Sequence, residues 1–310
     1  ENYSKKGAGA VSLWISDFMK YSSYKKKITV FGYSDNKNFL TKNYVNIKLK
    51  TINSKLNSST KEYSKNIIHY IKKNNFDIIE IHNRPVMVND FIKNSNSKII
   101  LYLHNDPKTM KGSKSIKEKL FLLENVHKIV FISNWVKNQF FSNLSFTDHS
   151  KTETIYHSID PIKKISKKKN QIIFVGKLNE SKGYDLFCQA IDNVLKKYDD
   201  WVAFSIGDEK RFQHYYTHKR HKNLGLLDNK KVLKIFEQSE IAVVPSRWDE
   251  PFGRTSLESS SRGCATIISN KGGLPETTDY AIILKNLNIH NIEKEVIKLI
   301  NNKQLRRKLQ

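Results

Sequence analysis

The sequence has few cysteines and no long apolar run. Only Cys188 and Cys264 occur in 310 residues. They lie far apart without neighbouring metal ligands, which argues against a disulfide scaffold or a zinc site. Both lie in apolar patterns, so we expect buried, reduced thiols. The sequence contains no stretch of about 18 apolar residues that could span a membrane. The start, ENYSKKGAGA, lacks the apolar core of a signal peptide. These features predict a cytoplasmic protein, or one bound peripherally at the inner face of the membrane.

Arginine is scarce beside lysine. The net charge is +24, but only 8 of the 54 basic residues are arginine, which leaves 46 lysines. Nucleic-acid readers favour arginine for bidentate contacts, and these lysines are spread along the chain. We therefore expect no nucleic-acid partner. A solvated lysine-rich surface is the first interpretation, and contact with an anionic membrane is the second.

Apolar strand patterns alternate with helical patterns in two blocks. In the first block we expect strands at 28–32, 76–81, 98–103, 128–133 and 154–156, and helices at 11–21, 67–71, 116–123 and 135–141. In the second block we expect strands at 171–175, 202–206, 241–244 and 265–269, and helices at 184–197, 230–238, 255–262 and 292–310. Such alternation predicts parallel sheets covered by helices on both faces.

The blocks define two α/β domains. A polar, lysine-rich stretch at 161–170 is the predicted linker between an N-terminal domain at 1–160 and a C-terminal domain at 171–310. Both would be doubly wound and Rossmann-like, with their ligand-binding loops facing a central cleft. Both chain ends look incomplete, because no strand precedes the turn at 7–10 and the last helix stops at 310.

The segment EPFGRTSLE, residues 250–258, follows an apolar strand and leads into a short helix. The free N–H groups of a helix N-terminus can bind a phosphate. The flanking carboxylates of Glu250 and Glu258 can accept hydrogen bonds from sugar hydroxyls. Taken alone, two glutamates at this spacing could equally be surface charges.

The longer run VVPSRWDEPFGRTSLESSSRGCATIISNKGGLPE, residues 243–276, resembles the donor-binding half of retaining glycosyltransferases of family 4. These enzymes have the GT-B fold. The resemblance implies transfer of a hexose-type sugar from a UDP- or GDP-linked donor to a hydroxyl of a glycan or lipid-linked acceptor. It assigns Glu250 to the donor sugar and Glu258 to the ribose. Backbone N–H groups at Phe252, Gly253, Arg254 and Thr255 would approach the sugar and the phosphates.

A second motif, VGKLNESKG at 175–183, matches the same family. Gly176 turns the chain after a strand, and Lys177 and Lys182 would stabilise the charge that develops on the departing diphosphate. Two ordinary surface lysines are the alternative. Gly207, at the end of the next strand, would border the nucleotide, and the base would lie near 223–227.

Two strands of the first block end in similar polar clusters, HNRP at 82–85 and HNDP at 104–107. The resemblance places His104 near the reaction centre, as a fourth catalytic candidate beside Lys177, Lys182 and Glu250. Asn83, Arg84 and Asp106 are assigned to the acceptor side. The clusters resemble a branch that builds cell-envelope polysaccharide, including lipopolysaccharide core.

Two weaker features complete the predicted site. Gly9, in the turn at 7–10, would contact donor phosphate or acceptor. His157-Ser158 stands where many relatives have Asn-Gly.

The sequence contains no HExxH, DxD-type or CxxC motif. Lysines and a helix dipole can do the work of a divalent ion, so we expect no metal and no cofactor. Two alternatives stay open. One is another GT-B enzyme, such as a nucleotide-sugar epimerase or a phosphorylase. The other is an inactive, basic fragment that binds sugar nucleotides or nucleic acid.

Overall fold

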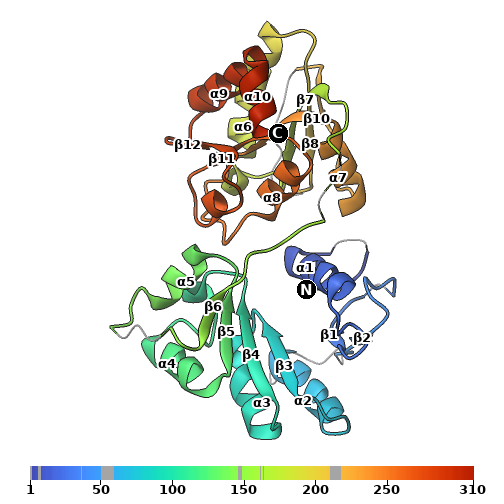
Figure 1. The fold of residues 1–310 in the computed structure, drawn as a ribbon, viewed down its shortest axis with the longest axis vertical. Coiled ribbons are helices and arrows are strands. Elements are labelled where there is room, and N and C mark those ends of the chain that lie inside the picture. The colour runs from blue at the N-terminus through green and yellow to red at the C-terminus, as the bar shows by residue number, and fades with distance from the viewer. Residues whose placement is uncertain are drawn as a thin grey trace. The chain divides into compact units, whose positions relative to one another are not determined.

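The computed structural model describes residues 2–5, 8–35, 37–49, 59–145, 149–160, 162, 164–209 and 218–310. The chain forms two compact units, Glu1–His157 and Ser158–Gln310. Figure 1 shows both as α/β units. Strand β7 begins at Lys169, inside the stretch predicted as a linker.

The first unit is built on a four-stranded parallel sheet in the order β3-β4-β5-β6. Its strands are β3 (Ile78–His82), β4 (Lys98–Leu103), β5 (Lys128–Phe131) and β6 (Thr152–Thr154). The predicted strand at 28–32 is reduced to β1 (Val30–Gly32). It pairs with β2 (Tyr44–Asn46) in a separate two-stranded sheet.

Helices lie before and between the strands of the first unit. They are α1 (Ala10–Tyr21), α2 (Ser59–Ile71), α3 (Val88–Asn94), α4 (Ile116–Asn125) and α5 (Asn134–Phe141), with 3-10 turns η1 (Pro85–Met87) and η2 (Pro107–Thr109). Ser115 and Glu118 form a capping box that begins α4, and the Ser133 side chain caps α5. On the sheet, Tyr102 and Val130 pack with Trp14 of α1. Helix α1 therefore covers that face.

The second unit contains six parallel strands in the order β12-β11-β10-β7-β8-β9. They are β7 (Lys169–Val175), β8 (Val202–Ile206), β9 (His221–Asn223), β10 (Ser239–Val244), β11 (Ala265–Ser269) and β12 (Ala281–Leu284). Read from β9, the first three strands run backwards and the last three forwards. This is the order of a dinucleotide-binding sheet, whose ligand lies at the carboxyl ends of the strands where the order reverses. That reversal falls between β7 and β10.

Consecutive residues of the central strands point to opposite faces. Ile172 packs in the core beneath α6 (Tyr184–Lys197) and α9 (Ile289–Asn301). Its neighbour Ile173 packs with Phe236 of α7 (Asn229–Gln238). The predicted doubly wound architecture is therefore confirmed in this unit, as Figure 1 also shows.

The remaining elements lie around the sheet of the second unit. They are η3 (Glu180–Lys182), α8 (Arg254–Ser261), η4 (Leu274–Glu276) and α10 (Lys303–Leu309). The single helix predicted at 292–310 was wrong, because α9 and α10 are separated at Asn302. The Asn302 side chain accepts a hydrogen bond from Leu305 N and so starts a new helix.

Both cysteines are buried and free, as predicted. Burial raises the pKa of each thiol to about 12, so both remain protonated and unreactive. Among the helices that the structure describes, none is long and apolar enough to cross a membrane.

Candidate active site

The loops after β7 and β10 are joined at the switch point of the second unit. The backbone N–H groups of Arg247 and Trp248 both donate to Ser181 O, each at 3.0 Å. The Arg247 guanidinium forms two 2.6 Å hydrogen bonds with the Asp185 carboxylate. A Cβ on Gly183, which has φ 70°, would lie 1.9 Å from Pro245 O. The two loops are therefore packed tightly against each other at the carboxyl ends of the strands.

Lys182 and Glu250 form an ion pair between these two loops. Their Nζ and Oε1 atoms are 2.5 Å apart, and the two side chains are 24% and 13% exposed. Lys182 Nζ also lies 4.7 Å from the centroid of the Trp248 ring. The sequence assigned Lys182 to the phosphate and Glu250 to the sugar, but nothing in it indicated that they pair. Trp248 was missed by the sequence analysis.

The GGLP segment holds the backbone of Glu250. Gly273 N donates to Glu250 O at 2.6 Å. Gly272 has φ 59°, and a Cβ there would lie 2.2 Å from the same oxygen. Only glycine allows this approach, which is a physical reason for the first glycine of the GGLP segment. Both glycines therefore help to position the backbone of Glu250.

Glu258 is buried on α8 and only 5% exposed. Its Oε1 accepts hydrogen bonds from Arg254 Nε at 2.7 Å and from Asn229 Nδ2 at 3.0 Å. The Arg254 guanidinium therefore holds Glu258, and the expected ligand contact of its backbone N–H group stays a prediction. Asn229, at the start of α7, was missed because no local pattern connects it with a residue 29 positions away.

Helix α8 begins without a side-chain cap. Its N-cap residue is Gly253, with φ 111°, and a Cβ there would lie 2.4 Å from Leu274 Cδ2. Phe252 is buried just before it, and Thr255 occupies the first turn. The first-turn N–H groups are the ones that a helix leaves unsatisfied, so this end can accept an anion.

The turns after β7 and β8 also pack together. Gly176 N donates to Ile206 O at 3.0 Å, and a Cβ on Gly207 would lie 1.8 Å from Gly176 O. Lys177, between these turns and η3, is exposed. Lys177 and Glu250 thus lie in loops of the second unit, Lys182 ends η3, and Glu258 lies on α8.

In the first unit, His104 and Asn83 are joined across neighbouring strand ends. His104 N donates to Asn83 Oδ1 at 2.7 Å. Asn83 has φ 53°, in the left-handed region that asparagine tolerates better than most residues. Arg84 is exposed, and its Nη1 donates to Asn83 O at 3.0 Å. Asn83 therefore has a structural task in holding the two strand ends together.

His104 is 3% exposed and lies between two other imidazoles, His82 and His157. Burial first, and then the neighbouring histidines, hold its pKa well below the ordinary 6.5. His104 is consequently neutral at physiological pH.

Asp106 and Gly9 have local tasks. Asp106 Oδ1 accepts from Lys108 N at 2.9 Å and caps η2. Gly9 is the N-cap of α1, with an ordinary extended φ of −80°. The rest of the predicted glycine turn includes Gly7, which lies outside the described residues.

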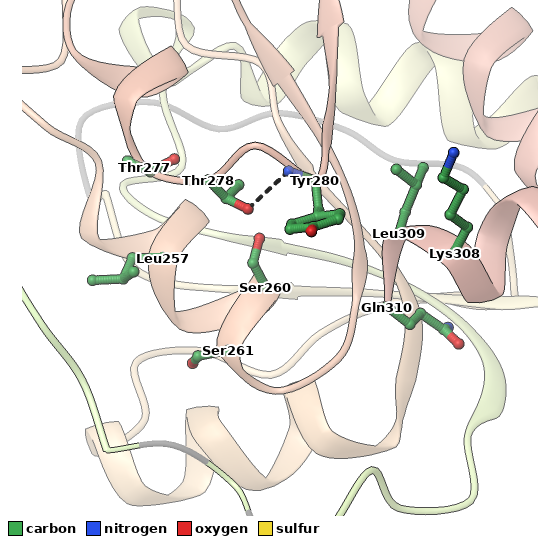
Figure 2. A pocket seen from close by; sticks show the side chains of 9 residues that line it. All are labelled: Leu257, Ser260, Ser261, Thr277, Thr278, Tyr280, Lys308, Leu309 and Gln310. Atoms are coloured by element: carbon green, nitrogen blue, oxygen red, sulfur yellow. Dashed lines mark hydrogen bonds between the residues drawn. The ribbon is translucent and has the colours of Figure 1, made fainter.

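A hollow of about 380 Å³ lies elsewhere in the second unit, on the far part of α8 (Figure 2). It is lined by Leu257, Ser260, Ser261, Thr277, Thr278, Tyr280, Lys308, Leu309 and Gln310. None of the predicted site residues lines it. Over the described ranges of the chain, no group of three or more His, Cys, Asp or Glu residues could hold a metal ion.

Comparison with known proteins agrees with this geometry. The family described as "Glycosyl transferases group 1" matches residues 157–310. YtcC of Bacillus subtilis (strain 168), which is named as a glycosyltransferase, is 24% identical over 88% of this chain and 74% of its own length. An uncharacterized 41.2 kDa protein in the cps region of Klebsiella pneumoniae is 25% identical over 74% of this chain and 70% of its own.

Solved structures show the same fold. HepE of Anabaena, in complex with UDP and glucose, superposes with a TM-score of 0.74 at 13% identity. The match covers 97% of this chain and 89% of that one. The chain therefore belongs to the glycosyl transferases group 1 family, whose match spans residues 157–310, and has the GT-B fold of two Rossmann-like domains.

Proposed function

We propose that this chain is a retaining, metal-independent glycosyltransferase that moves a hexose-type sugar from a nucleoside-diphosphate sugar to a hydroxyl of a glycan or lipid-linked acceptor. The observation that carries the proposal is the Lys182–Glu250 pair, 2.5 Å apart, at the switch point between β7 and β10. A cation and a carboxylate there can bind the phosphate and the hydroxyls of one donor molecule.

The basic groups of the site would stabilise the negative charge of the leaving group. As the glycosidic bond breaks, the diphosphate gains negative charge, which positioned cations and helix N–H groups stabilise. Lys182, Lys177 and the uncapped start of α8 supply these in this chain. Since Lys182 is already paired with Glu250, an arriving phosphate competes for the amine. Glu250 is then released to accept hydrogen bonds from sugar hydroxyls.

Glu258 is the proposed ligand of the ribose. Arg254 and Asn229 both donate to its Oε1 and fix the carboxylate in place. A carboxylate has room for about four hydrogen bonds over its two oxygens. Held rigidly by these two donors, Glu258 can also receive the two ribose hydroxyls.

The donor and acceptor classes rest on relatives. HepE was solved with UDP and glucose, which supports a UDP-hexose before a GDP-linked one. The relative from a cps region supports an acceptor in cell-envelope polysaccharide synthesis, lipopolysaccharide included. We place the reaction in the cytoplasm, with peripheral attraction of the lysine-rich surface to an anionic membrane face.

The test is a thermal-shift screen with UDP-, GDP- and ADP-sugars and the free diphosphates. A ligand that binds only the folded state raises the melting temperature by mass action. We expect one nucleotide family to stabilise the wild type and to lose its effect in Glu258→Ala. The control Glu295→Ala removes a carboxylate of α9 that is paired with Lys298 and should keep the shift.

Product analysis then decides the reaction. A transferred sugar that keeps its anomeric configuration, formed in the presence of a chelator, supports the proposal. Free epimerised sugar, or cleavage that depends on phosphate, would point to the other GT-B enzymes. Binding of nucleic acid without any donor would replace the proposal with a binding function.

A further inference from the structure

Three histidines from separate parts of the first unit form a continuous hydrogen-bonded chain. His82 Nδ1 lies 2.9 Å from His104 Nε2, and His104 Nδ1 lies 3.1 Å from His157 Nε2. His82 ends β3, His104 follows β4, and His157 follows β6. His104 offers a different ring nitrogen to each neighbour, so the three rings do not converge on one point as metal ligands would. They are arranged as a relay.

Aromatic rings enclose the relay. The centroid of Trp14, from α1, lies 5.6 Å from His82, 5.4 Å from His104 and 5.8 Å from His157. Tyr102 stacks on His82 at 4.7 Å. His104 and His157 are 3% and 6% exposed. In this apolar enclosure, the hydrogen bonds between the rings fix the ring orientations, because breaking one would leave a buried polar atom unsatisfied.

The relay has only two self-consistent proton arrangements. A neutral imidazole has one N–H and one acceptor nitrogen, and His104 is held neutral by burial and by its neighbours. If His104 donates from Nε2, it accepts at Nδ1; if it donates from Nδ1, it accepts at Nε2. The direction at one end of the relay therefore sets every ring.

Glu80 sets that direction. Its Oε2 lies 3.6 Å from His82 Nε2, which places a charged side chain at the His82 end of the relay. A carboxylate favours the N–H on the nitrogen that faces it. His82 Nδ1 is then an acceptor, so His104 carries its proton on Nε2 and accepts from His157 through Nδ1.

We propose that Glu80, His82 and His157 are positioning residues that hold His104 as the neutral Nε2–H tautomer in a fixed ring orientation. The consequence for catalysis rests on the proposed function and on the role of His104 as a catalytic candidate. The tautomer itself is independent of that function. Glu80 and His82 from β3, and His157 from the loop after β6, thus set the tautomer of His104, the candidate catalytic histidine.

Imidazole ¹⁵N chemical shifts test the tautomer directly, since protonated and unprotonated ring nitrogens resonate far apart. The full chain is labelled, and His104 is assigned by the signals lost in His104→Gln. We expect Nε2 protonated and Nδ1 unprotonated near neutral pH. A protonated Nδ1, or a doubly protonated ring, would overturn the proposal.

Variants of Glu80 test the cause. Glu80→Leu removes the acceptor, so His104 should shift toward a mixture of tautomers. Glu80→Gln keeps an acceptor oxygen and should keep the wild-type pattern. The control Glu153→Leu, on β6 and paired with Lys128, should leave the His104 signals unchanged. A wild-type pattern in Glu80→Leu would show that Glu80 does not set the direction.

Turnover separates positioning from mere packing. His82→Phe keeps a ring against Trp14 and Tyr102 but offers His104 no acceptor, whereas His82→Gln restores one. We expect roughly a tenfold lower kcat for Phe, the loss of about one hydrogen bond, with donor KM within about twofold, and substantial recovery for Gln. Equal kcat in both variants would refute the role of His82.

The two proposals fail in different ways. If the wild type transfers no sugar to any acceptor, the proposed function falls, while the ¹⁵N result still decides the tautomer. If His82→Phe fails to fold, the wild-type spectrum and the Glu80 variants decide it.

Discussion

At the scale of single residues, the pairing of Lys182 with Glu250 is the feature on which the candidate site depends. Both side chains are less than a quarter exposed, and Trp248 shields the amine from one side. Removing one partner leaves a largely desolvated charge, which costs more than the pair itself contributes. The same two groups can therefore be tested for stability and for turnover.

We expect Lys182→Met and Glu250→Gln each to lower the unfolding free energy by about 1–2 kcal/mol, with the double variant losing about 1 kcal/mol less than their sum. Turnover should fall by about 100-fold or more in each single variant, because a group that stabilises the transition state is lost. Urea unfolding and donor-dependent transfer are the measurements. The exposed pair Lys128–Glu153, 39% and 50% exposed, is the control and should couple by less than about 0.5 kcal/mol. A coupling as small as this between Lys182 and Glu250 would count against the pair.

At the scale of elements, glycines decide how closely the loops of the second unit approach. Gly183 ends η3 and lets the loop meet Pro245 at the end of β10. Gly272 does the same for Glu250. These loops carry Lys182 and Glu250. The positions of both charged groups therefore depend on close backbone contacts that a Cβ atom at Gly183 or Gly272 would prevent.

We expect Gly183→Ala to lower the unfolding free energy by about 3 kcal/mol or more, because its Cβ adds a backbone clash to left-handed strain. Gly225→Ala is the matched control. It has nearly the same φ, 69°, but no atom within 4 Å of the added Cβ, so it should cost only about 1–2 kcal/mol. Chemical denaturation compares the two, and equal losses would show that strain alone matters at Gly183.

At the scale of the whole molecule, each unit buries a histidine that must stay neutral. In the first unit it is His104. In the second it is His221, whose Nε2 lies 2.7 Å from Ser205 Oγ. Burial lowers the pKa of His221 from 6.5 to about 4, against the opposing charge of Asp192. Both histidines bind a proton more readily in the unfolded chain than in the folded one.

The contribution of these neutral histidines to the unfolding free energy should therefore be fully present above about pH 6.5. It should fall as the pH drops toward 4, because the unfolded state takes up more protons than the folded one. A pKa of about 4 against 6.5 corresponds to about 3 kcal/mol of unfolding free energy. We expect His221→Gln to flatten this dependence, measured by urea unfolding from pH 4.5 to 8. His290→Gln, at an exposed site of α9, should leave the slope as in the wild type. An unchanged slope in His221→Gln would assign the acid sensitivity to other groups.

The sequence by itself determined the fold class and most elements. Strands such as β4, β8 and β11, and helix α6, have their predicted bounds, because buried parallel strands and amphipathic helices are written in local apolar patterns. The motif at 243–276 likewise identified the family. Short strands such as β2 and β9 were missed, because three residues with few apolar side chains leave little apolar signal.

Only the tertiary structure decided which groups meet. Lys182 and Glu250 are 68 residues apart, and Asn229 reaches Glu258 from another helix. The His82–His104–His157 relay uses a residue, His157, that the sequence marked only as a departure from the family pattern. Such contacts depend on strand order and loop packing. Local sequence predicts each strand, but the pairing of strand ends is set by long-range burial that no single segment encodes.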